Sequence, residues 1–219
     1  MLKMKELYNL CASTNIALGK IEKYIIEHSI TPEMITRVAI KLSDKYCYEK
    51  IQFEYLNERK PKPNELVTAN WKELFDLFIR YGLAPNLVFC DDGVNYENVM
   101  EMLSHIDDES VVLPIFKKLL EIGGDPNLML GKESLIETID TRVTIDVDEL
   151  QDRTLFEIEL KLWLLLIGYG GKLDKRKAVK MQNGYAVDIF KDYTRLAYQY
   201  DNGKLYIILK ESKKIVAVA

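Results

Sequence analysis

The chain holds few of the residues from which most catalytic and metal sites are built. Its 219 residues include two histidines, His28 and His105, and neither has another histidine or a cysteine at metal-ligand spacing. Each histidine stands near the end of an expected helix, where a cation interacts favourably with the helix dipole. No serine or cysteine stands in a nucleophile signature. We therefore expect no catalytic residue, no bound metal and no cofactor.

Cysteines and long apolar runs are equally scarce. Cys11, Cys47 and Cys90 are widely spaced, odd in number and form no C-x-x-C pair, so we expect three buried, reduced thiols. The first residues have no apolar core of signal-peptide length behind them. The longest apolar run, residues 160–167, is interrupted by Lys161 and is too short to cross a bilayer. These absences predict a cytoplasmic protein without a membrane segment.

The chain also lacks an excess of positive charge. It carries 34 acidic and 30 basic residues, a net charge of −4, whereas nucleic-acid binders need a basic patch. The glycine-rich residues 168–171 follow an expected helix rather than a strand, so they indicate a turn and not a phosphate-binding loop. With 48% hydrophobic and 29% charged residues, the composition is that of a folded protein. We expect no nucleic-acid partner.

What the chain does have is a helix ending that recurs. Apolar residues at three- and four-residue steps predict a helix over residues 109–122, and Gly123 ends it because glycine adopts the left-handed conformation of a helix C-terminus. The same ending is found at Gly82 and at Gly170, 41 residues before and 47 residues after Gly123. A helix followed by a turn at such a period predicts a stack of helix pairs, a solenoid.

The turn sequences resemble the ankyrin repeat. L-L-E-I-G-G-D-P-N (residues 119–127) is similar to the end of an ankyrin repeat, F-I-R-Y-G-L-A-P-N (78–86) is a second copy, and L-I-G-Y-G-G-K-L (166–173) is a worn third. The repeats are longer than the usual 33 residues, and the T-P-L-H start of the first helix is absent. Asn95 and Ser134 stand where that start would be, and both are suited to cap an inner helix.

A second resemblance concerns function. Long, degenerate ankyrin-like repeats, the segment E-S-L-I-E-T-I-D (133–140) and the helix end W-x-x-L-x-G (163–168) are similar to small bacterial ankyrin-like proteins, many of them immunity proteins of polymorphic toxin systems. The resemblance implies a non-enzymatic protein-interaction scaffold, an intracellular immunity protein that neutralises a basic toxin by covering it. A regulatory adaptor for another cytoplasmic protein and an unrecognised enzyme are the alternatives.

The expected architecture is a mainly α fold of two parts. Residues 1–190 form the ankyrin-like solenoid, in which Thr31 caps a long helix that begins at Pro32, and Trp71 and Trp163 belong to the core. Residues 141–152 fit either a helix or a strand, and the solenoid favours a helix. Helices are expected over residues 7–12, 16–27, 31–59, 71–81, 95–106, 109–122, 132–139 and 155–167.

Residues 191–219 are expected to form a small antiparallel β-meander that packs on the end of the solenoid. Asn202-Gly203 is a favoured two-residue hairpin turn. Counting outward from it pairs Tyr200 with Leu205, Tyr198 with Ile207 and Leu196 with Leu209. A second turn near Ser212 would place Val216 opposite Leu209 and Val218 opposite Ile207.

Acidic residues supply the candidate binding site. They gather after Gly82 and again around residue 146, and such runs either solvate a surface or dock a basic partner, whose encounter they accelerate. Tyr96 adds a rigid, amphipathic side chain of the kind common in interfaces. The candidate protein-contact residues are Asp91, Asp92, Tyr96, Glu137, Asp140, Asp146, Asp148, Glu149 and Asp152.

Overall fold

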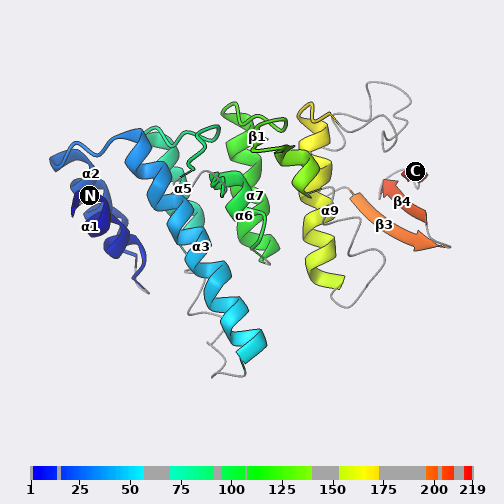
Figure 1. The fold of residues 1–219 in the computed structure, drawn as a ribbon, viewed down its shortest axis with the longest axis horizontal. Helices are drawn as coiled ribbons and strands as arrows, with labels where there is room; N and C mark the ends of the chain where they lie inside the picture. The colour runs from blue at the N-terminus through cyan, green and yellow to red at the C-terminus, as the bar shows by residue number, and fades with distance from the viewer. Residues whose placement is uncertain are drawn as a thin grey trace. The chain divides into compact units, whose positions relative to one another are not determined.

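The computed structural model is mainly helical, as the sequence predicts (Figure 1). It describes residues 2–13, 16–56, 70–90, 95–106, 108–139, 153–172, 196–201, 204–209 and 215–218. The helices are α1 (Leu2–Cys11), α2 (Leu18–Glu27), α3 (Pro32–Leu56), α5 (Trp71–Arg80), α6 (Val99–Leu103), α7 (Glu109–Glu121) and α9 (Arg153–Gly168), with a further helical segment over residues 135–139. The strands are β1 (Met129–Leu130), β2 (Glu133–Ser134), β3 (Leu196–Asp201), β4 (Lys204–Leu209) and β5 (Ile215–Val218).

The chain divides into two compact units, Met1–Gly124 and Asp125–Ala219. The division falls inside the expected 1–190 array. The expected boundary between residues 190 and 191 stays a prediction. Residues 141–152, expected to be helical, all lie outside the described part of the chain.

The described residues of the first unit form three helix pairs in two layers. α1 packs on α2, α3 on α5, and α6 on α7; along one layer α3 contacts both α1 and α6, and along the other α5 contacts both α2 and α7 (Figure 1). Phe75, Phe78 and Phe116 are fully buried between the layers. Each pair therefore buries its apolar stripes against its own partner and against the neighbouring pair.

The long helix α3 begins as its sequence predicts. The Thr31 hydroxyl oxygen accepts a hydrogen bond of 3.3 Å from the backbone nitrogen of Met34, and Pro32 is the first helical residue. The Thr36 hydroxyl donates to the Pro32 carbonyl at 2.8 Å and accepts from the Ala84 backbone nitrogen at 3.0 Å. That second bond fixes the chain after α5 against the start of α3.

The three glycine corners have one geometry. Gly82, Gly123 and Gly170 have φ values of +90°, +100° and +94°. In each corner the residue after the glycine donates its N–H to the carbonyl five residues earlier, at 2.9 Å, 2.9 Å and 2.8 Å respectively. This is the 6→1 bond of the Schellman motif, and it satisfies a carbonyl that the end of the helix leaves open.

A fourth corner of the same kind follows α2, where the sequence has no glycine. Ser29 has a φ of +49°, and Ile30 donates its N–H to the Ile25 carbonyl at 3.1 Å. The sequence pattern did not reveal it because serine rarely adopts positive φ. With Ser29 included, α2, α5, α7 and α9 all end in the same way.

The inner helix expected over residues 95–106 is shorter than predicted. α6 spans only Val99–Leu103, because Glu97 pairs with Phe89 in an antiparallel bridge and Asn98 is extended, with φ −138° and ψ 146°. Asn98 caps the helix, so the expected cap at Asn95 was wrong. Residues 95–98 instead form the extended segment that contains the bridge residue Glu97 and leads into α6.

The three-stranded sheet of the second unit confirms the predicted hairpin. β3 pairs with β4 in the predicted register, Tyr200 with Leu205, Tyr198 with Ile207 and Leu196 with Leu209. The pairing of β5 differs from the prediction by two residues, since Val218 lies opposite Leu205 and Val216 opposite Ile207. A two-residue shift keeps the same residues on each face, so alternation alone could not decide between the two registers.

The expected state of the cysteines is right for one residue and wrong for another. Cys11 is buried, and burial raises the pKa of its thiol to about 12. Cys90, which follows the buried bridge residue Phe89, is exposed. The side chain of Cys47 lies outside the described part of the structure. Trp71 and Trp163 are buried, as expected for core residues.

Candidate interaction face

The segment between α5 and α6 is a finger that leaves the helices and returns. We define the first finger as residues 85–90 and 95–98. Phe89 and Glu97 exchange two backbone hydrogen bonds, of 2.9 Å and 2.8 Å, which bring the two arms together. The Arg37 guanidinium lies over the Phe89 ring, 3.9 Å from its centroid, and ties the base of the finger to α3.

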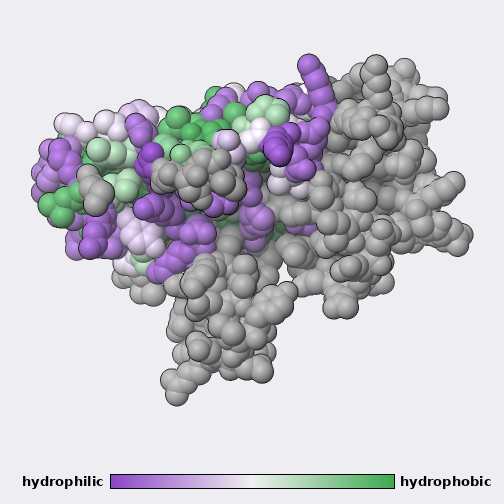
Figure 2. All heavy atoms as spheres, viewed as in Figure 1, coloured by the Kyte–Doolittle hydropathy of each residue, from purple (hydrophilic) through white to green (hydrophobic). Residues whose placement is uncertain are grey.

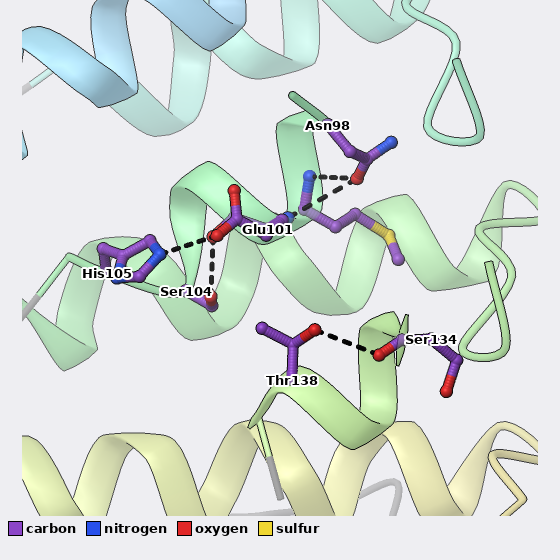
Figure 3. Close-up of polar contacts among 7 residues, drawn as sticks. Asn98, Glu101, Ser104, His105, Ser134 and Thr138 are labelled. Carbon is purple, nitrogen blue, oxygen red and sulfur yellow. Dashed lines mark hydrogen bonds and ion pairs between the residues drawn. The ribbon is translucent and has the colours of Figure 1, made fainter. Parts of the chain in front are cut away.

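Asn98 is fully buried at the junction of this finger with α6, and its side chain makes four hydrogen bonds. Its Oδ1 accepts from the backbone nitrogens of Met100 (2.8 Å) and Glu101 (3.4 Å), which caps the helix (Figure 3). Its Nδ2 donates to the carbonyls of Pro85 (2.7 Å) and Leu87 (3.0 Å). One amide therefore satisfies two helix donors and two finger acceptors.

The side chains of Glu101 and His105 contact each other at the end of α6. Nε2 of His105 lies 2.7 Å from Oε1 of Glu101, four residues earlier (Figure 3). Oε2 of Glu101 is buried and has no hydrogen-bond partner among the described residues. The hydroxyl of Ser104 donates to the Glu101 carbonyl at 2.6 Å, which fixes the last turn. The contact holds a largely buried carboxylate on the same helix that Asn98 caps.

The first finger exposes an aromatic and an acidic side chain next to each other. Tyr96 is 40% exposed at the first finger, and Glu97 beside it is exposed as well. Residues 81–116 contain no lysine and no arginine, so the acids have no basic neighbour in the sequence. Apolar residues also gather on the viewed surface where α5 ends and the finger follows (Figure 2). We call Tyr96 and Glu97 on the finger, together with His105 and the largely buried Glu101 (side chain 12% exposed) on α6, the acidic finger face.

The second unit contains a finger of related construction. β1 and β2 form a short hairpin in which Met129 is 54% exposed. The carbonyls of Pro126 and Leu128 accept from the backbone nitrogens of Ile136 (3.1 Å) and Leu135 (2.8 Å). These two carbonyls stand 41 residues after those of Pro85 and Leu87, which the Asn98 side chain satisfies. The same two acceptors are thus met by backbone in one finger and by a side chain in the other.

Glu137 is used locally in this second finger. Its Oε2 accepts from both the backbone nitrogen and the hydroxyl of Ser134, each at 2.7 Å. The backbone bond is one half of a capping box at the start of the helical segment. The bonds from the Ser134 backbone and hydroxyl lower the pKa of the Glu137 carboxyl. This carboxylate supports the helix start while it contributes negative charge to the surface.

Asn86 and Asn127 each stand four residues after a corner glycine. Within its own unit, each donates a side-chain hydrogen bond to the carbonyl of the next corner glycine. In the first unit, Nδ2 of Asn86 donates to the carbonyl of Gly123 at 2.9 Å. In the second unit, Nδ2 of Asn127 donates to the carbonyl of Gly170 at 3.1 Å, and its Oδ1 accepts from the backbone nitrogen of Lys172 at 2.7 Å. The spacing between corners differs, yet the bonding is the same.

Two of the nine predicted contact residues, Tyr96 and Glu137, are described by the structure. The other seven lie outside the described residues, so their grouping into one face stays a prediction: Asp91, Asp92, Asp140, Asp146, Asp148, Glu149 and Asp152. Sequence reasoning did not select the Glu101–His105 pair, although its four-residue spacing on an expected helix was a usable signal. It also missed Asn98, whose role depends on contacts with residues 85 and 87.

The described segments contain neither a group of metal-ligating side chains nor a membrane-spanning helix. None of their histidine, cysteine, aspartate and glutamate residues form a group of three or more able to hold a metal ion. No described helix combines the length and the apolar character that crossing a bilayer needs.

No protein-family model matches the chain, and no curated protein or solved structure matches it either.

Proposed function

We propose that this protein is a non-enzymatic binding scaffold, an ankyrin-like solenoid of helix pairs whose fingers and inner helices contact another protein. The observation that carries the proposal is the recurrence of one corner and one corner-to-corner bond, Asn86 to Gly123 and Asn127 to Gly170. Repeated units of this kind stack side by side and present their loops along one surface. Such surfaces mostly serve protein recognition.

The proposed mechanism is occlusion of a basic partner, and the proposed biological role is that of a bacterial immunity protein that neutralises a toxin. The acidic finger face offers the exposed aromatic ring of Tyr96 beside the exposed carboxylate of Glu97, in a stretch of sequence, residues 81–116, that contains no lysine or arginine. Tyrosine supplies contact area at low cost in side-chain entropy, and acidic groups accelerate the approach of a basic surface. The resemblance to immunity proteins favours a toxin as the partner.

The test is capture of partners by the tagged full-length chain from its native host at low and high salt. A single stoichiometric basic protein, released by high salt, is the expected result. The variant Tyr96→Ala/Glu97→Lys should reduce its association rate about tenfold or more. Purified partner, measured by surface plasmon resonance, gives this rate directly.

The matched control is Ile26→Ala/Glu27→Lys, which makes the same kind of change on α2. Ile26 is 60% exposed and Glu27 is exposed, but both lie in the other helical layer. The control variant should bind as the unmodified chain does. Equal association rates for the finger variant and the unmodified chain would contradict the proposed face, and several substoichiometric partners would favour an adaptor over an immunity protein.

A further inference from the structure

The first finger and α6 share one buried side chain. Each element is too short to be stable in isolation. α6 has five residues, far fewer than an isolated helix needs in water. The finger has one backbone bridge, between Phe89 and Glu97, and a lone bridge is a weak tie. The side chain of Asn98, which is 0% exposed, joins them. Two of its four hydrogen bonds go to the finger and two go to α6.

Each element keeps Asn98 in place for the other. If the first turn of α6 opened, Asn98 would turn away and leave the buried carbonyls of Pro85 and Leu87 without donors. If the finger opened, Nδ2 would lose both acceptors inside a site closed to water. A buried polar group left without its hydrogen bond is costly, so opening of one element removes the support of the other.

From this geometry we propose that the first finger and α6 open and close as a single cooperative unit, coupled through the Asn98 amide. Tyr96 and Glu97 on the finger and Glu101 on α6 then keep their positions together or lose them together. The coupling itself does not depend on the proposed function. It is a property of the hydrogen bonds described above, and it is tested without any partner.

The experiment is native-state hydrogen exchange on the full chain, read at four amides. Phe89 and Glu97 report the finger, and Met102 and Ser104, which donate to the Asn98 and Met100 carbonyls, report α6. In the unmodified chain the four amides should exchange with the same opening constant. Two clearly separate opening constants would overturn the proposal.

Asn98→Ser separates coupling from capping. Serine retains an oxygen that caps a helix, but it does not supply two donors to the finger carbonyls. The coupled unit predicts that exchange rises by roughly tenfold to a hundredfold at all four amides, including those of α6. Independent elements would show faster exchange at Phe89 and Glu97 alone, and that result would overturn the proposal.

A second variant leaves Asn98 in place and breaks the finger instead. Glu97→Pro removes the N–H that donates to the Phe89 carbonyl. Faster exchange at Met102 and Ser104 supports coupling, and unchanged exchange there contradicts it. The control is Asp108→Ala, which removes the cap that accepts from the Ser110 nitrogen at 3.0 Å at the start of α7. Its effect should be confined to the first turn of α7.

Discussion

Ser29 is the clearest case of one residue held in a conformation that suits another amino acid. It occupies the left-handed position of the corner after α2 with a φ of +49°, where the other corners have Gly82, Gly123 and Gly170. A side chain at positive φ costs about 1–2 kcal/mol, part of which is returned because glycine is more flexible in the unfolded chain.

We predict that Ser29→Gly stabilises the protein by about 0.5–1 kcal/mol. The measurement is the free energy of unfolding from urea titration. Ser29→Ala is the matched control, since it removes the hydroxyl but keeps the Cβ, and it should bring no gain. A stabilisation of equal size in the alanine variant would show that the hydroxyl, and not the backbone conformation, is the source.

At the scale of the element, a carboxylate supports the helical segment over residues 135–139. Glu137 accepts two bonds from Ser134, and these bonds lower the pKa of its carboxyl below the ordinary value of 4.5. A lowered folded-state pKa means that the ionised form stabilises the fold. That contribution is complete above the unfolded-state pKa and is lost as pH falls through the folded-state pKa.

We predict that Glu137→Gln lowers stability at pH 7 by about 0.5–1 kcal/mol and flattens the loss of stability that the unmodified chain shows as pH falls below 4.5. Urea titrations of both chains between pH 3 and pH 7 check this. Glu133→Gln, one residue before Ser134, is the control for loss of one negative charge. A pH profile for Glu137→Gln that parallels the unmodified chain would contradict the role given to the carboxylate.

The elements also show why part of the structure was readable in the sequence. The glycine corners and the pairing of β3 with β4 depend on chemistry close by in the sequence, so their positions followed from the residues themselves. The register of β5 and the length of α6 did not, because they depend on pairing with residues distant in the chain. The bonds from Asn98 to the finger gave no local signal, since its two carbonyl partners are 11 and 13 residues away.

For the whole molecule, the exposed ion pairs and the proposed binding face should respond differently to salt. Arg80 lies 3.0 Å from Glu22 and Lys118 lies 2.7 Å from Asp76, so each pair joins neighbouring helices of one layer in the first unit. All four side chains are exposed, and exposed pairs contribute at most about 1 kcal/mol each.

We therefore predict that the free energy of unfolding changes by less than about 1 kcal/mol between 0.05 and 1 M sodium chloride. Partner association should fall by at least about tenfold over the same range, because approach to the acidic finger face is electrostatic. Urea titration and stopped-flow association measure the two quantities on the same protein. A parallel loss of stability and association would assign the salt effect to folding instead of recognition.

The four corners also bear on how this chain tolerates changes of length. From Ser29 to Gly82 there are 53 residues, then 41 to Gly123 and 47 to Gly170, while each corner closes with the same backbone bond. Residues can therefore be added or removed between corners without altering how a helix ends. The corners keep a constant geometry while the segments between them vary in length. Those segments are therefore the places where insertions, deletions or new surface residues can be introduced.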